Sequence, residues 1–264
     1  MNTIYKKIKC VGGPCFYVEY GEENRDTILF LHGYSDSAKT FEPLKDYLSS
    51  KYRVIIPDLP MVRRKGISYD LQGLSTFVNE AVVKIGLRKF ILCGFSFGGL
   101  VAADYAYWYP KRVKKLYLLN CVPRFLEPQM IDKLLISVEP REVPRLIYPL
   151  FAFLKATKIG RALVPKTDRL EESIKHIRLR PFEVLGTFYD VLWHNIVGGT
   201  WSERVRKFNK MPMPKAVVLF KDDNLVSYKK YASKLRRLGV EVITFDKGGH
   251  GETKEYWENL KTLF

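Results

Sequence analysis

The stretch of this chain best suited to chemistry is Gly94–Gly98, which reads G-F-S-F-G and places Ser96 between two glycines. The apolar run Phe90–Cys93 precedes it and predicts a buried strand, and the Leu-, Val- and Ala-rich segment after it predicts a helix that ends at Pro110. Strand, sharp turn and helix form the context in which this pattern presents a serine hydroxyl as a nucleophile. The alternative is a glycine-rich turn with an uninvolved serine, because the five-residue pattern alone is weak evidence.

Two other predicted strands are followed by the groups that a serine nucleophile needs. A serine hydroxyl is a poor nucleophile near neutral pH, so an imidazole must take its proton and a buried carboxylate must orient the imidazole. Asp222 and Asp223 follow the apolar run Ala216–Phe220, and His250 follows Glu241–Phe245. These groups would lie at the carboxyl ends of parallel strands, where open α/β sheets bind ligands. The order serine, aspartate, histidine therefore predicts a catalytic triad that uses one of the two aspartates.

The other elements must hold these groups at one edge of a sheet. Two alternating segments at the start of the chain predict an antiparallel pair, and the later continuous apolar runs predict strands that are covered on both faces. The eight predicted strands are Ile4–Lys9, Phe16–Tyr20, Thr27–Leu31, Tyr52–Ile56, Phe90–Cys93, Val113–Leu119, Ala216–Phe220 and Glu241–Phe245. The predicted helices of this part are Ser35–Ser50, Leu71–Ile85, the segment up to Pro110, Ser227–Leu238 and Glu252–Phe264. The fold class is therefore α/β, with a mostly parallel, doubly wound, eight-stranded sheet.

The alternation of strands and helices breaks between residues 123 and 200. This segment has helical periodicity but no apolar run typical of a buried strand. We therefore divide the chain into a core formed by residues 1–122 and 201–264, and a helical insertion formed by residues 123–200.

At this point the chain resembles the α/β-hydrolase fold family over nearly its whole length. The stretches that carry the resemblance are Leu29–Gly33, Ile56–Pro60, Gly94–Gly99, Tyr109–Asn120, Asp223–Val226 and Gly249–Glu252. The resemblance places the insertion at the position of a lid after the sixth strand. Its apolar segment 148–154 either lines a pocket for an apolar group or packs the lid on the core.

The resemblance also assigns roles to individual residues. Ser96 is expected to be the nucleophile and His250 the base, and the spacing Asp-x-x-Val favours Asp223 over Asp222 as the orienting acid. The backbone N–H groups of Tyr34 and Phe97 are expected to form the oxyanion hole. Three other polar residues have structural interpretations: His32 as a hydrogen-bonded core residue, and His176 and His194 as packing or surface residues of the insertion.

The resemblance predicts a serine hydrolase. We expect Ser96 to form an acyl-enzyme from a small-molecule carboxylic ester with an apolar acyl or alcohol part, with no cofactor and no metal. A serine at this turn disfavours epoxide hydrolases, which resemble this fold but use a carboxylate nucleophile. An acyltransferase, a carbon–carbon bond hydrolase and a ligand-binding protein that keeps the triad without turnover stay open as alternatives.

The chain departs from the family pattern in the loop Met61–Ser68, which is long and carries Arg63, Arg64 and Lys65. A solvated loop is the simpler interpretation, and a rim that binds anions is the alternative.

The composition describes a soluble globular protein with a basic surface. The net charge is +16, and the basic excess is spread along the chain rather than gathered in a tail. No zinc-finger spacing or basic low-complexity arm is present, so we expect a solvated basic surface without a specific nucleic-acid site, although weak association with an anionic membrane surface is compatible with the charge. Four cysteines without metal-ligand spacing favour reduced, buried thiols and a cytoplasmic location. We expect a monomer or a homodimer.

Overall fold

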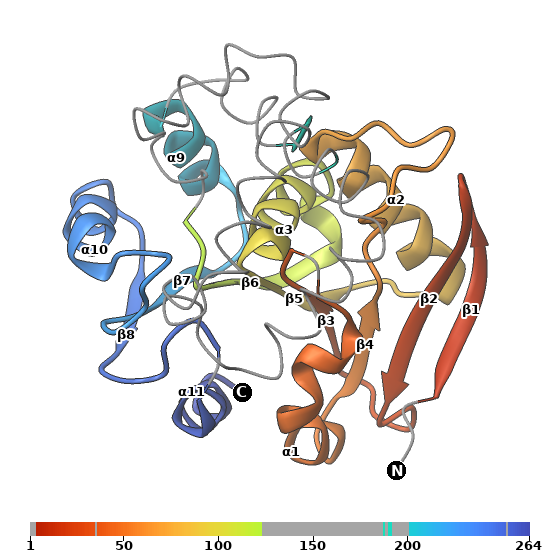
Figure 1. Cartoon of the computed structure of the whole chain (residues 1–264), viewed down its shortest axis with the longest axis horizontal. Helices are drawn as coiled ribbons and strands as arrows, with labels where there is room; N and C mark the ends of the chain where they lie inside the picture. The colour runs from red at the N-terminus through yellow and green to blue at the C-terminus, as the bar shows by residue number, and fades with distance from the viewer. Residues whose placement is uncertain (1–3, 35, 123–186, 188–189, 192–200, 252) are drawn as a thin grey trace, which may run out of the picture.

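The predicted sheet is present in the computed structural model, which describes residues 4–34, 36–122, 187, 190–191, 201–251 and 253–264. The strands of these residues form one sheet in the order β1-β2-β4-β3-β5-β6-β7-β8 (Figure 1). They are β1 (Tyr5–Cys10), β2 (Gly13–Tyr20), β3 (Thr27–Leu31), β4 (Arg53–Pro57), β5 (Phe90–Phe95), β6 (Val113–Leu119), β7 (Lys215–Phe220) and β8 (Val242–Phe245). β2 pairs antiparallel with both β1 and β4, and the other pairings are parallel, which confirms the predicted fold class.

Helices cover both faces of the sheet (Figure 1). One face shares an apolar core with α2 (Leu71–Ile85), α3 (Phe97–Trp108), α9 (Trp201–Lys210) and α10 (Tyr228–Arg237). The other face packs on the 3-10 helix and the short α-helix of residues 38–49 and on α11 (Lys254–Lys261). The central strand β3 is buried at every position, as a strand covered on both faces must be.

α2 has the predicted bounds because its sequence contains both a start and a stop signal. The Asp70 carboxylate accepts a hydrogen bond from the backbone N–H of Gly73 and caps the first turn. Gly86 follows the last turn with φ +82°, a conformation that costs glycine little and other residues more. Between these caps, Leu71, Leu74 and Val78 face the core.

Two helical segments differ from the prediction. Instead of one helix over Ser35–Ser50, a 3-10 helix (η1, Ala38–Leu44) leads into the short α1 (Lys45–Ser49). Pro43 lies inside η1, and its lack of an N–H and its ring geometry disfavour a continuous α-helix there. α9 was not predicted, although Trp201, Val205 and Phe208 recur at the i, i+4, i+7 spacing of an apolar helical stripe. Val205 and Phe208 are buried in the core.

The parallel strands bring their carboxyl ends into line. In the register of β5 and β6, Phe95 lies opposite Leu119, and the backbone N–H of Ser96 donates to the Leu119 carbonyl at 2.9 Å. In the same way the N–H of Asn120 donates to the Val218 carbonyl of β7 at 2.9 Å. The residues that follow these strands are therefore held beside one another by ladder hydrogen bonds.

Candidate active site

Ser96 lies at a tight turn between β5 and α3. Its backbone has φ +50° and ψ −118°, a conformation that non-glycine residues rarely adopt and that costs about 1–3 kcal/mol. The flanking glycines are required sterically. A Cβ atom at Gly94 would lie 2.4 Å from the Gly98 carbonyl oxygen, and one at Gly98 would lie 2.3 Å and 2.4 Å from the carbonyl oxygens of Leu31 and His32. The glycines therefore let α3 begin against β3 and β5, which exposes the serine at the turn.

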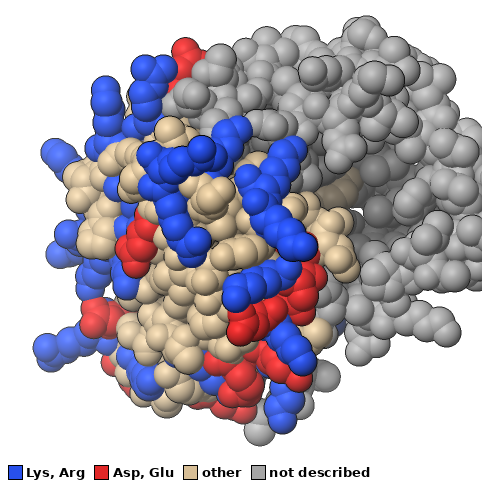
Figure 2. All heavy atoms as spheres, turned by 90° about the vertical axis from the view of Figure 1, so that its left-hand side faces the viewer, with Lys and Arg blue, Asp and Glu red and all other residues tan. Residues whose placement is uncertain are grey.

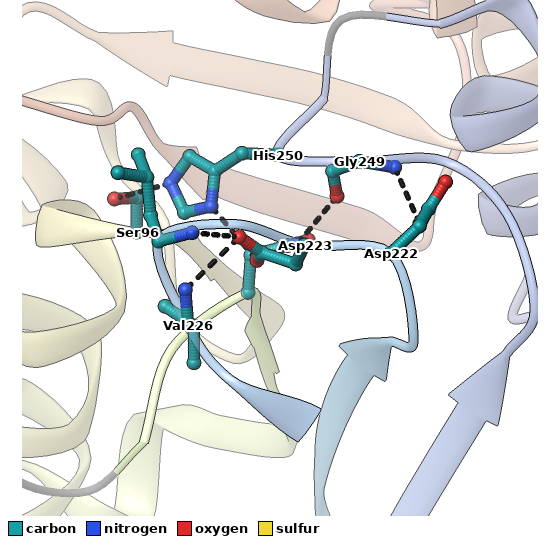
Figure 3. Close-up of polar contacts among 8 residues, drawn as sticks. Ser96, Asp222, Asp223, Val226, Gly249 and His250 are labelled. Carbon is teal, nitrogen blue, oxygen red and sulfur yellow. Dashed lines mark hydrogen bonds and ion pairs between the residues drawn. The ribbon is translucent and has the colours of Figure 1, made fainter. Parts of the chain in front are cut away.

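His250 links Ser96 to Asp223 (Figure 3). Its Nε2 lies 2.9 Å from the Ser96 Oγ, and its Nδ1 lies 2.9 Å from the Asp223 Oδ2. An ionised carboxylate can only accept, so Nδ1 carries the proton and donates to Asp223. In the neutral imidazole with this tautomer, Nε2 accepts from the hydroxyl of Ser96, as a general base must.

The Asp223 carboxylate is buried and fully engaged by donors. Its Oδ1 accepts hydrogen bonds from the backbone N–H groups of Leu225 at 2.7 Å and Val226 at 2.9 Å, and its Oδ2 accepts from Asn120 as well as His250. Burial alone would raise the pKa of this carboxyl, but the bonds from His250, Asn120 and Val226 outweigh it and hold the pKa below the ordinary value. The group is therefore charged when it orients the imidazole.

Asp222 and Asp223 have different hydrogen-bond partners in the structure. The Asp222 carboxylate accepts hydrogen bonds from the backbone N–H groups of Gly248 at 3.1 Å and Gly249 at 2.9 Å. Figure 3 shows the bond from Gly249. It fixes the loop that carries the histidine but does not contact the imidazole. Asp246, which is nearer to the histidine in sequence, has a side chain that is 81% exposed and pairs with a lysine.

Asn120 is a site residue whose role the sequence analysis missed. Its Nδ2 donates to the Asp223 Oδ2 at 2.6 Å and to the Gly249 carbonyl at 3.0 Å, so it joins the acid loop to the histidine loop. Its backbone has φ +47°, which asparagine tolerates better than most residues. The available signal was its type and place, a polar residue directly after the buried strand β6.

The family of this chain follows from a match to a family model that covers most of its length. The model of the alpha/beta hydrolase fold matches residues 26–251, which include Ser96, Asp223 and His250. The chain belongs to the α/β-hydrolase fold family. The match includes the turn at Ser96 and the two later loops that carry Asp223 and His250, so the parts of the site come from one family pattern.

Three relatives each match less than half of this chain, and the matched stretch spans less than half of each relative's own length. A serine hydrolase-like protein of Mus musculus is 29% identical over 121 residues, which are 44% of this chain and 39% of that protein. Epoxide hydrolase 4 of Homo sapiens is 31% identical over 124 residues, 44% of this chain and 33% of that protein. A pimeloyl-[acyl-carrier protein] methyl ester esterase of Shewanella sp. (strain MR-7) is 33% identical over 114 residues, 43% of this chain and 41% of that protein.

Solved structures resemble the whole α/β-hydrolase fold at low sequence identity. A hydrolase from Pseudomonas aeruginosa PA01 superposes with a TM-score of 0.73 at 15% identity, covering 98% of this chain and 96% of that one. The enol-lactonase from Burkholderia xenovorans LB400 has a TM-score of 0.71 at 16% identity, covering 98% and 97%. At such identities the likeness concerns the fold alone.

The backbone segments that carry Tyr34 and Phe97 lie beside the serine. Phe97 is the first residue of α3, and a Cβ atom at Gly33 would lie 3.6 Å from the Ser96 Cβ. His32 holds the first segment in place: its Nδ1 bonds to the Gly33 carbonyl at 2.8 Å, and its Nε2 accepts from the N–H of Leu59 at 2.9 Å. This imidazole is 1% exposed and serves the backbone, in agreement with its structural interpretation.

Two cations of the loop Met61–Ser68 have protein partners. Arg63 forms an ion pair with Asp190, which belongs to the predicted insertion, and its guanidinium lies 5.2 Å from the Tyr69 ring centroid. Arg64 donates to the Pro14 carbonyl at 2.7 Å. These contacts tie the loop to three parts of the chain and favour neither a freely solvated loop nor an open anion-binding rim.

Most of the predicted lid lies outside the described residues, as do His176, His194 and the apolar segment 148–154. The boundaries at residues 123 and 200 therefore stay predictions. In the part of the chain that the structure describes, no three His, Cys, Asp or Glu residues gather as metal ligands would. No helix of that part is long and apolar enough for a membrane span. All four cysteines are free and buried.

Proposed function

We propose that this protein is a serine hydrolase that cleaves a small-molecule carboxylic ester with an apolar acyl or alcohol part. The observation that carries the proposal is the continuous hydrogen-bonded series Ser96 Oγ, His250 Nε2, His250 Nδ1 and Asp223 Oδ2, with 2.9 Å at both links. Such a series, with a buried carboxylate at one end and a serine at a strained turn at the other, activates a hydroxyl for attack.

In the proposed reaction the Ser96 oxygen attacks the ester carbonyl carbon while its proton passes to the His250 Nε2. The oxyanion that forms accepts hydrogen bonds from the backbone N–H groups of Tyr34 and Phe97, each worth about 3 kcal/mol in the transition state. The alcohol leaves with the proton held by His250, and the acyl group stays on the Ser96 oxygen. A water molecule then gives a proton to His250 and attacks the acyl carbon, which releases the acid and restores the serine.

The side chain at the turn favours an ester over an epoxide. The relatives include proteins named as epoxide hydrolases and as a methyl ester esterase. Epoxide hydrolases that resemble this fold use a carboxylate as nucleophile, whereas this chain has Ser96 at that position and a base poised to deprotonate it. We propose an apolar acyl or alcohol part because the insertion is rich in aromatic and aliphatic residues. The dependence of ester hydrolysis on acyl chain length tests this element of the proposal.

The alternatives differ in the reaction, if any, that the triad performs. An acyltransferase passes the acyl group to a second alcohol or thiol rather than to water, a carbon–carbon hydrolase attacks an activated ketone, and a ligand-binding protein releases its ligand unchanged. All three would keep the same triad, so the triad alone does not separate them. The alternatives are separated instead by the acyl acceptor and by the bond that is broken.

The proposal is tested by treating the purified protein with a fluorophosphonate probe and then with nitrophenyl esters of increasing acyl length. We expect the wild type to be labelled and to release nitrophenol, with no labelling of Ser96→Ala and normal labelling of the exposed serine variant Ser50→Ala. A wild type that neither labels nor hydrolyses any ester refutes the proposal, and an optimum at the shortest acyl group refutes its apolar part.

The neighbouring aspartates provide a matched pair of variants. Asp223→Asn removes the charge that orients the imidazole and should lower kcat by about 10⁴-fold, as the loss of a triad acid does. Asp222→Asn changes a carboxylate that only accepts from two backbone N–H groups, so kcat should fall by about tenfold or less. Equal losses in the two variants would contradict the assignment of the acid.

A further inference from the structure

The aromatic ring of Phe95 packs against the imidazole of His250. Phe95 is the last residue of β5 and directly precedes Ser96 in the chain. Its ring centroid lies 5.2 Å from that of the imidazole, with 46° between the two ring planes. Aromatic pairs interact favourably at centroid separations of about 4.5–7 Å. One residue therefore joins the strand that leads to the proposed nucleophile with the side chain of the proposed base.

The Phe95 ring is itself held in place by its surroundings. Phe95 is 4% exposed. A Cβ atom at Gly33 would lie 3.1 Å and 3.2 Å from two carbons of this ring, so the backbone at Gly33 packs directly against it. The Tyr256 ring of α11 packs edge-on at 6.0 Å, with 71° between the planes. Because a close-packed interior leaves such a ring little room to move, it forms a rigid surface for the imidazole.

The imidazole needs such a surface when its hydrogen bonds change during the reaction. Before attack, His250 is bonded to the Ser96 Oγ and to the Asp223 Oδ2, each at 2.9 Å. In the acyl-enzyme of the proposed function, the Ser96 oxygen carries the acyl group and has no proton to donate. Of these two bonds, only the one to Asp223 then remains. A single hydrogen bond does not fix the plane of a histidine ring, whose outer side-chain torsion is broad.

We propose that Phe95 is a positioning residue that keeps the His250 Nε2 directed at the water molecule that attacks the acyl-enzyme. The kinetic part of this proposal rests on the proposed function, whereas the contact between the rings does not. Phe95 transfers no proton and carries no charge. Its loss should therefore slow the second half of the reaction, in which water attacks, more than the first half, in which the Ser96 hydroxyl also holds the imidazole.

The first test measures the two halves of the reaction separately in Phe95→Leu. Rapid mixing with a nitrophenyl ester gives the acylation rate from the release of nitrophenol and the deacylation rate from the later release of the acid. Deacylation should slow by about tenfold, because a misdirected base loses much of its effect, and acylation should stay within about threefold of the wild type. Equal losses in both halves would overturn the proposal, since a general distortion of the site slows both.

The substitution leaves the charge of the protein unchanged. Figure 2 shows Lys and Arg side chains spread over the side of the molecule that carries α10, and such a surface attracts anionic substrates. The nitrophenyl ester is therefore an uncharged one. If Phe95→Leu does not fold, Phe95→Met takes its place with the same expected results, because its flexible chain fills the space without a flat ring.

Phe41→Leu is the matched control. Phe41 belongs to the same apolar cluster as Phe95 and is 2% exposed. In the contacts that the structure describes, its ring packs on Phe30 at 4.4 Å and on Trp257 at 6.3 Å. The control should lower the midpoint of urea denaturation by a similar amount, with both halves of the reaction within about threefold of the wild type. A control that slows deacylation as much as Phe95→Leu would reduce the effect to core packing and refute the proposal.

The second test needs no turnover, so it separates this proposal from the proposed function. Ser96→Ala removes the hydroxyl and leaves the imidazole with the same bond to Asp223 as in the acyl-enzyme. In protein with isotope-labelled histidine, the proton on the His250 Nδ1 should give a resolved magnetic-resonance signal, assigned by its loss in His250→Gln. Ser96→Ala and Ser96→Ala with Phe41→Leu should keep this signal, and Ser96→Ala with Phe95→Leu should lose it by exchange with water.

The two tests have distinct outcomes. A wild type that hydrolyses no ester refutes the proposed function and with it the kinetic part of this proposal, while the magnetic-resonance signal still decides whether Phe95 positions the imidazole. An equally sharp signal in Ser96→Ala with and without Phe95→Leu would overturn the proposal even in an enzyme that hydrolyses esters.

Discussion

The hydrogen bond from Asn120 to Asp223 should contribute more to stability at neutral pH than in acid. Asn120→Ala removes a donor that lies 2.6 Å from a buried carboxylate. A hydrogen bond to a charged group contributes about 1.5–3 kcal/mol and one to a neutral group about 0.5–1.5 kcal/mol. The ionised form of Asp223 should therefore lose about 1–1.5 kcal/mol more than the protonated form, and the pKa of this carboxyl should rise by about one unit.

The direction of the pH effect follows from the lowered pKa of Asp223 in the folded protein. A carboxyl with a lowered pKa stabilises the fold above its ordinary pKa, 3.8 for this group, and the contribution is lost as the pH falls through the folded pKa. The difference in unfolding free energy between the wild type and Asn120→Ala should thus be largest from neutral pH down to about pH 5. It should shrink by about 1–1.5 kcal/mol as Asp223 becomes protonated in both proteins.

The measurement is urea denaturation of both proteins at a series of pH values from about 7 to about 3. Asn24→Ala is the matched control, because the Asn24 side chain donates to the Ser49 backbone carbonyl at 2.8 Å, which does not titrate. Its free-energy difference from the wild type should be the same at every pH. A constant difference for Asn120→Ala as well would refute the bond to an ionised Asp223.

Three further predictions concern the turn, its packing and the thiols. Ser96→Gly should be about 1 kcal/mol more stable than Ser96→Ala by urea denaturation, since only glycine relieves the strain at φ +50°; equal stabilities would mean that the turn stores no strain. Gly98→Ala should lose more than about 2 kcal/mol of stability, because its Cβ would lie within 2.4 Å of two backbone carbonyl oxygens, and a loss below about 0.5 kcal/mol would contradict this packing. Burial raises the pKa of the Cys15 thiol to about 12 and that of Cys93 well above its usual value, so a thiol reagent at neutral pH should react with none of the four cysteines before unfolding; rapid reaction of a native thiol would disprove their burial.

Predictions from the sequence were most accurate where local signals agree with tertiary packing. α2 combines a capping aspartate, a glycine stop and a regular apolar stripe, so its predicted bounds match the structure. The segment 35–50 also has a helical apolar pattern, but Pro43 changes the backbone geometry without changing that pattern. α9 also has apolar residues at helical spacing, Trp201, Val205 and Phe208, but these are three apolar residues in ten, so its pattern is a weaker signal than that of α2.

The sequence order and spacing were sufficient to name the three residues that the structure brings together, whereas their partners required coordinates. The roles of Ser96, Asp223 and His250 stay proposals. The alternative position of Asp222 was resolved by its bonds to two glycine N–H groups, which no spacing rule reveals. The ion pair between Arg63 and Asp190 joins positions 127 apart in the chain, beyond the reach of any local pattern.

The hydrogen bond between Ser96 and His250 joins residues 154 positions apart. During synthesis, Ser96 is therefore made well before His250. A ribosome adds roughly 5–20 residues per second, so the proposed nucleophile is made roughly 8–30 s before its base exists. A nascent chain that already contains the turn at Ser96 therefore still lacks the base that the proposed mechanism requires. Contacts this distant also form slowly, because the intervening loop must close before they bring any stability. Under the proposed mechanism the Ser96 hydroxyl becomes reactive only after the last strand of the sheet has docked, so ester hydrolysis would report a completed fold.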